Sequence, residues 1–248
     1  MIAALLIAPA VKWAILLVTA FIAATLAAIS GFGGAAVLLP VLAIFFGVRQ
    51  AIPILTVAQL IGNGSRVWFN RSELNYQVVG WFALGGVPTA IIGSFLFARA
   101  PMSLLTRLLG AFLIAMAIWR RWKPNAVPKI PLRGFAILGA ISSFLSALLG
   151  SVGPLMAPFF LFYGLLKGAY IGTEAFSTII MHVTKLVIYR QQSVLPIAAI
   201  LSGLALGPIM VVGSFTGKKI VDRIPERVFI VIIELVMFGF GLLFLIRG

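Results

Sequence analysis

Long apolar stretches recur along the whole chain and are separated by short turns that contain glycine, proline or charged residues. Hydrophobic residues make up 62% of the 248 positions and charged residues only 10%. A soluble domain is about 45–50% apolar and about 25% charged. A soluble fold could not cover this much apolar surface, so lipid must be the main solvent around the chain. Because a membrane span needs about 20 apolar residues, we expect roughly eight to ten membrane segments.

The apolar runs that these turns separate predict an all-α fold, a polytopic bundle of transmembrane helices. The helices are expected at residues 11–30, 34–47, 52–69, 77–98, 102–121, 134–150, 154–166, 171–190, 194–216 and 226–247. Two of them, 34–47 and 154–166, are shorter than a span and begin beside glycines, which indicates broken or re-entrant helices. The pattern leaves open whether these two segments cross the membrane or turn back within it.

The two halves of the chain resemble each other. Residues 84–95 read LGGVPTAIIGSF and residues 204–215 read LALGPIMVVGSF, with leucine, proline, glycine, serine and phenylalanine in register. Each half holds an odd number of crossings, so the second copy enters the membrane upside down, as in many secondary transporters. The predicted organisation is a first transmembrane repeat at 1–121, a basic cytoplasmic linker at 122–133 and a second repeat at 134–248.

The formal net charge is +14, from 19 basic and 5 acidic residues. Most of this excess fits loops that follow the positive-inside rule, which places the basic linker in the cytoplasm and both termini outside. Nucleic-acid binding is not expected, because no soluble basic face with interleaved aromatics is evident. The chain has no cysteine, which excludes disulfides and thiolate chemistry. Nucleotide-binding and hydrolase motifs are also missing, so we expect neither an enzyme nor a cofactor.

Two glycine-rich breaks are the first candidate binding elements. The first break contains Gly31, Gly33 and Gly34, and the second contains Gly150 and Gly153. A half-helix that starts inside the membrane points unpaired backbone N–H groups and its positive dipole end at whatever lies beyond, which suits an anion. The alternative is that these small residues only allow close helix packing.

Two polar stripes at helical spacing are the second candidate elements. The substrate-binding candidates on them are Gln59, Asn63 and Arg66 in the first repeat, and Thr178, His182 and Lys185 in the second. Charged side chains within a span usually face a cavity or a partner, although Arg66 and Lys185 could instead extend to the membrane surface. His182 fits either a functional or a purely structural histidine. Glu174 and Glu234 are candidates for coupling to an ion or proton.

Four segments carry the glycine breaks and the polar stripes, namely SGFGGAAVLLPVLAIFFGV (30–48), ILTVAQLIGNGSRVWFN (54–70), LLGSVGPLMAPFFLFYGLLKGAYIGTEAFST (148–178) and MHVTKLVIY (181–189). Taken together, these segments resemble the TauE/SafE family of sulfite exporters and anion permeases. The resemblance implies an inverted-repeat transporter that exports sulfite or organosulfonates.

The resulting expectation is a multi-pass protein of the cytoplasmic membrane that exports sulfite or a related small organosulfur anion by a secondary mechanism. Its expected partners are that anion and membrane lipid, and the sequence leaves open whether the chain forms a homo-oligomer. Alternative readings are a transporter of another small anion such as a carboxylate, a membrane-embedded enzyme or an assembly subunit. The substrate, the coupling ion and the direction of transport are beyond what the sequence decides.

Overall fold

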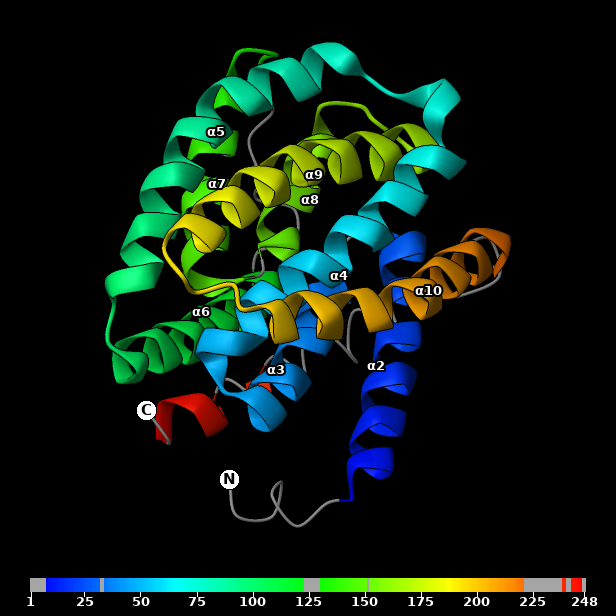
Figure 1. Cartoon of the computed structure of the whole chain (residues 1–248). Coiled ribbons are helices and arrows are strands. Elements are labelled where there is room, and N and C mark those ends of the chain that lie inside the picture. Colours follow the sequence, from blue (N-terminus) through cyan, green and yellow to red (C-terminus); the bar gives the residue numbers. More distant parts are fainter. Residues whose placement is uncertain are drawn as a thin grey trace.

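The computed structural model describes residues 8–31, 34–122, 130–150, 152–220, 238–239 and 242–246. Over these residues the chain is helical, with no strand (Figure 1). The first half contains α2 (Pro9–Ser30), α3 (Gly34–Phe46), α4 (Val48–Phe69), the short η1 (Arg71–Glu73), α5 (Tyr76–Arg99) and α6 (Met102–Trp122). The second half contains α7 (Gly134–Leu149), α8 (Gly153–Phe162), α9 (Lys167–Gln191) and α10 (Ile197–Ile220).

These bounds confirm the nine helices expected from 11–30 to 194–216, with ends shifted by a few residues. The last expected helix, 226–247, lies mostly outside the described residues, although 242–246 is helical. Among the described residues, four helices are long and apolar enough to cross a membrane, namely α2, α5, α9 and α10. By contrast, α3 and α8 have 13 and 10 residues, too short for a span. The prediction of an all-α polytopic membrane bundle is confirmed.

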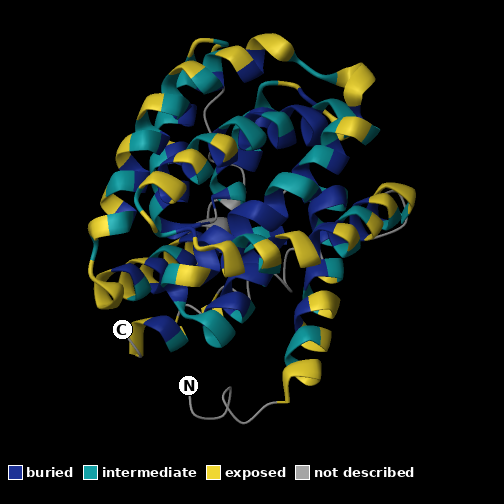
Figure 2. Cartoon of the chain, in the orientation of Figure 1, coloured by how far each residue is buried: buried dark blue, intermediate teal, exposed yellow. Residues whose placement is uncertain are grey.

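Burial in the bundle differs from that in a soluble protein at the outer surface and at the centre. Large apolar side chains such as Leu84 and Ile137 are 65% and 67% exposed on the outside of the bundle. Several polar and charged side chains are instead buried at its centre, among them Lys185 and Asn63, both at 0%. Figure 2 shows this buried centre where α4 and α9 lie. An apolar exterior, around a core that also holds polar and charged side chains, is what a lipid solvent permits.

The two halves interlock rather than lying side by side as separate bundles. The fourth α-helix of each half packs along the first helix of the other half, so that α10 lies on α2 and α5 lies on α7. Glycines permit this close approach. A Cβ added at Gly213 would lie 2.6 Å from the Phe21 carbonyl oxygen, and one at Gly93 would lie 2.8 Å from the Phe144 carbonyl oxygen. Between these pairs, α4 packs against α9 at the centre.

Two glycines set the breaks at which α2 and α7 end. Gly31 has φ 76° and donates its N–H to the Ala27 carbonyl at 2.9 Å. Gly150 has φ 79° and donates to the Ser146 carbonyl at 2.8 Å. Left-handed backbone is readily adopted only by glycine, so both helices stop at equivalent places. The next helices, α3 and α8, begin within three residues of these stops.

Candidate functional site

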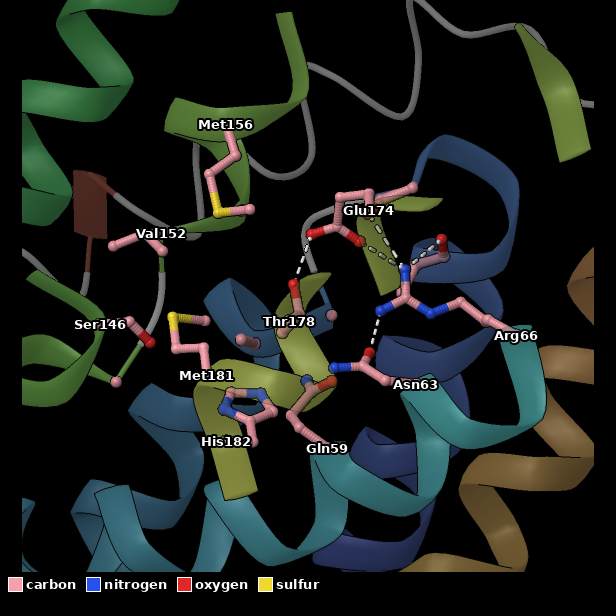
Figure 3. Close-up of a pocket in the computed structure, with 16 residues that line it drawn as sticks. Gln59, Asn63, Arg66, Ser146, Val152, Met156, Glu174, Thr178, Met181 and His182 are labelled. Carbon is pink, nitrogen blue, oxygen red and sulfur yellow. Dashed lines mark hydrogen bonds and ion pairs between the residues drawn. The ribbon is translucent and has the colours of Figure 1, made fainter. Parts of the chain in front are cut away.

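A cavity of about 40 Å³ lies where the two helix breaks meet the middle of α4 and α9 (Figure 3). Since one water occupies about 10–15 Å³ on this measure, the cavity has room for roughly three waters or one compact oxyanion. Its polar and charged lining side chains are Gln59, Asn63, Arg66, Ser146, Glu174, Thr178 and His182. The lining therefore comes from both halves of the chain.

Both breaks contribute backbone to the cavity wall. Gly31 and Gly34 line it from the first half, and Gly150 and Gly153 line it from the second. The cavity thus lies beside the carbonyl ends of α2 and α7 and the N–H ends of α3 and α8. The N–H ends carry partial positive charge and unpaired donors, and the carbonyl ends carry partial negative charge. Gly33 lies outside the described residues.

Arg66 is the most highly connected side chain of the site. Its Nη1 donates to the carbonyl oxygens of Gly31 at 3.0 Å and Ala27 at 3.3 Å. The same nitrogen lies 3.4 Å from Glu174 Oε2, and Nη2 donates to Asn63 Oδ1. The guanidinium therefore stabilises the negative end of α2 and also joins α4 to α9. Glu174 accepts a second hydrogen bond, from the Thr178 hydroxyl at 3.1 Å.

Lys185 repeats part of this arrangement in the second half. Its Nζ donates to the Ser146 carbonyl at 3.3 Å and to the Ser146 hydroxyl at 3.0 Å, at the end of α7. Lys185 is 0% exposed and lies behind Ser146, not in the cavity lining. Arg66 and Lys185 are both buried within the protein, so neither extends to its surface as a residue that reaches the membrane interface must.

Asn63 and His182 hold corresponding positions on α4 and α9, 119 residues apart, as do Arg66 and Lys185. Both line the cavity and both are buried, at 0% and 3% exposure. Among the described residues, Asn63 Nδ2 and His182 Nδ1 have no hydrogen-bond partner. Figure 3 shows the Asn63 amide nitrogen pointing away from Arg66, on the side of Gln59 and His182. Both atoms are therefore available to form hydrogen bonds with a molecule in the cavity.

The structure brings together most of the residues singled out in the sequence. Gln59, Thr178 and Glu174 share the cavity with the four described glycines, Asn63, Arg66 and His182. Glu234 lies outside the described residues, and Lys185 stands one layer back. Sequence reasoning did not assign Ser146 or Met156 to the site. Ser146 had a signal, because it belongs to a run of serines at 142, 143 and 146 in an otherwise apolar helix.

Comparison with known proteins shows which family the chain belongs to. The model of the family described as Sulfite exporter TauE/SafE matches residues 16–244, which include every residue of the cavity lining. The chain belongs to the TauE/SafE family. None of the curated proteins and none of the solved structures compared with the chain gives a match. Membership of TauE/SafE confirms the resemblance noted in the sequence and makes the chain a multi-pass membrane transporter of sulfite or related anions.

Proposed function

We propose that this TauE/SafE protein exports sulfite, or a related small organosulfur anion such as a sulfonate, across the cytoplasmic membrane by a secondary mechanism. The observation that carries the proposal is the cavity itself. It is small, it lies between the two halves, and the N–H ends of two interrupted helices border it. Binding sites of this kind, at broken helices near the centre of the membrane, recur in secondary transporters.

In this proposal the anion is held by backbone and side chains together. The unpaired N–H groups at the starts of α3 and α8, near Gly34 and Gly153, donate to its oxygens. Gly31 and Gly150 present backbone without a side chain to the cavity, and Gly33 stays a candidate by sequence alone. Gln59, Asn63, Thr178 and His182 orient the oxygens, and Arg66 and Lys185 supply positive charge from the cavity wall and from the layer behind it.

Transport then requires that the cavity open to each side of the membrane in turn. A site that both halves line can do so if one half rocks against the other. The membrane potential favours exit of an anion from a negative-inside cell. Glu174 is the coupling candidate in the cavity, because its ion pair with Arg66 is a contact that a proton or a guest anion could break. Glu234 stays a coupling candidate by sequence alone.

Radiolabelled sulfite flux in proteoliposomes tests the proposal. We expect saturable flux that requires the protein, increases when the compartment holding the label is negative inside, and is competed by small sulfonates more strongly than by acetate. Strong competition by acetate would instead favour a carboxylate transporter. Absence of protein-dependent sulfite flux, with a folded protein in the same vesicles, would refute the proposal.

A further inference from the structure

A second cavity, of about 400 Å³, lies apart from the central one and opens to the outside of the bundle. It is a groove between the last turns of α5, the first turns of α6 and Leu148 of α7. Leu96, Leu104 and Leu108 line the groove and are 49%, 47% and 41% exposed, whereas Leu105 beneath them is fully buried. The groove has the size of a small-molecule site, and its apolar walls suit hydrocarbon.

One end of the groove carries a charge. Arg99, the last residue of α5, lines that end, is exposed, and has no hydrogen bond or ion pair within the described part of the chain. With 24 residues, α5 is about 36 Å long, which exceeds the roughly 30 Å hydrocarbon core of a bilayer. Arg99 therefore reaches the level of the lipid headgroups, and the apolar wall of the groove lies directly below it. A phospholipid has the same order of parts, a phosphate above its acyl chains.

Two further arginines lie near the same end of the groove. Arg49 donates from Nη2 to the Ala100 carbonyl at 2.5 Å and from Nη1 to the Ala98 carbonyl at 3.4 Å, so its guanidinium lies at the end of α5. Arg107 is exposed on α6, three residues after Leu104, a spacing that makes the two side chains neighbours. The positive charge of this end therefore does not depend on Arg99 alone.

No carboxylate of the described residues balances these arginines. Of the five acidic residues, only Glu73 and Glu174 fall within the described part of the chain. Glu73 precedes α5, so the whole length of that helix separates it from Arg99 (Figure 1). Glu174 lies in the central cavity beside Arg66. The charged end of the groove thus complements a phosphate, and it offers no partner to the ammonium group of a zwitterionic lipid.

We propose that this groove binds one anionic phospholipid, with an acyl chain along Leu96 and Leu104 and the headgroup phosphate on Arg99. The inference is independent of which anion the protein transports. Leu148, on the inner wall of the groove, is two residues before Gly150, which lines the central cavity. A lipid in the groove therefore packs against the end of α7 that borders the transport site.

Two lipids with identical acyl chains and different headgroups test the inference. Delipidated full-length protein is titrated with phosphatidylglycerol or phosphatidylcholine, and bound lipid is counted by native mass spectrometry. We expect the first phosphatidylglycerol to bind at least about fivefold more tightly, since each basic residue near an anionic headgroup is favourable. Glycerol 3-phosphate, which has the phosphate and no chain, should not displace it. Displacement would indicate a site for soluble phosphate and would refute the proposal.

A charge variant tests the headgroup contact. Arg99→Gln should lower the preference for phosphatidylglycerol by about fivefold and leave the affinity for phosphatidylcholine nearly unchanged. Arg71→Gln is the matched control, because Arg71 is exposed at the opposite end of α5 and should leave the preference as it is. The readout is a ratio of affinities within one variant, which a general loss of folded protein does not alter.

A variant that fills the groove tests the position of the chain. Leu104→Trp should weaken binding of both lipids by about tenfold, because it displaces a chain segment worth roughly two buried methylene groups, and should leave their ratio unchanged. Leu84→Trp is the matched control, since Leu84 is 65% exposed on α5 and lies outside the groove.

The outcomes decide the proposal without reference to sulfite flux. Equal affinity of the wild-type protein for the two lipids, or an unchanged preference in Arg99→Gln, would refute the headgroup contact. Unchanged binding in Leu104→Trp would refute the groove as the site of the chain. A preference for phosphatidylglycerol that Arg99→Gln removes, together with weaker binding in Leu104→Trp and normal binding in Leu84→Trp, supports the proposal.

Discussion

Arg66 Nη1 and Glu174 Oε2 lie 3.4 Å apart and join the two halves of the chain through a cavity that both residues line. Their side chains are 6% and 4% exposed, so neither charge is balanced by solvent. Breaking such a buried pair from one side leaves an uncompensated charge in the interior. The pair therefore ties the stability of the fold to the charge state of the site.

Arg66→Gln should lower the free energy of unfolding by about 3–5 kcal/mol, because it leaves Glu174 buried without its cation. The double variant Arg66→Gln/Glu174→Gln should recover part of that loss. Unfolding in mixed detergent micelles measures both. Arg71→Gln is the control, since Arg71 is exposed and stacks on Trp68 at 4.6 Å. An Arg66→Gln protein as stable as wild type would show that the pair contributes little.

Asn63→Asp should weaken binding of methanesulfonate by at least roughly ten- to a hundredfold, since one hydrogen bond to a charged group is lost and an ionised carboxylate would also repel the anion. The substitution keeps the shape of the side chain and an oxygen for Arg66, but it replaces the donor Nδ2 with an oxygen that cannot donate when ionised. Calorimetric titration of the purified variant measures the change. Unaltered affinity would mean that Nδ2 does not contact the anion.

Arg66→Lys should reduce the affinity for sulfite only in part, whereas Arg66→Gln and Lys185→Gln should nearly eliminate flux. Lysine keeps the charge and loses the planar fork that serves several acceptors at once. Flux at limiting sulfite in proteoliposomes, normalised to reconstituted protein, compares the three variants. Flux through Lys185→Gln equal to that of the wild type would remove Lys185 from the site and leave the backbone N–H groups as the main anion holders.

Gly150→Ala should destabilise the protein by about 1–2 kcal/mol from backbone conformation alone, because the residue has φ 79°. The added Cβ would also lie 3.0 Å from Ile52 Cγ1 and 3.1 Å from Leu39 Cδ2. Gly80→Ala is the matched control. It lies within α5 with open space around it, so alanine there should stabilise the helix by about 0.5–1 kcal/mol. Thermal unfolding in detergent distinguishes the two, and equal midpoints would contradict the role of Gly150 as the stop of α7.

Single introduced cysteines should report the orientation in the membrane, since the chain has none of its own. Ser72 in η1 and Gln191 at the end of α9 are both exposed. If the positive-inside rule places the basic linker in the cytoplasm, Gln191→Cys should react with an impermeant maleimide in intact cells and Ser72→Cys only after the membrane is opened. The reverse pattern would invert the predicted topology.

The helices were predictable because their ends carry local signals. Gly31 and Gly150 end α2 and α7 in a left-handed backbone conformation, and a glycine after an apolar run is the usual sequence signal for such an end. The short lengths of α3 and α8 also follow from the sequence, because their apolar runs are short. Helical spacing likewise placed Gln59, Asn63 and Arg66 on one face of α4. Periodicity of this kind is a property of a single segment, so it can be recognised before the tertiary structure is known.

The partners of these residues were not predictable, because they depend on contacts between distant segments. The ion-pair partner of Glu174 is Arg66, 108 residues earlier, and no spacing along α9 indicates it. Lys185 belongs to the same polar stripe as His182, yet only the packing of α7 against α9 decides that it lies behind Ser146 and not in the cavity. Helical spacing predicts which residues share one side of a helix. It does not predict how far each of those side chains lies from the cavity.

The interlocked packing of α2 with α10 sets the order in which the protein can be completed during synthesis. When α2 and α4 leave the ribosome, α10 and α9 do not yet exist. Arg66 is therefore synthesised before Glu174, and more than a hundred further residues must be translated before the two can pair. A nascent first half therefore contains a cation whose acidic partner has not yet been made, and a charged side chain inside a span is costly until that partner is in place.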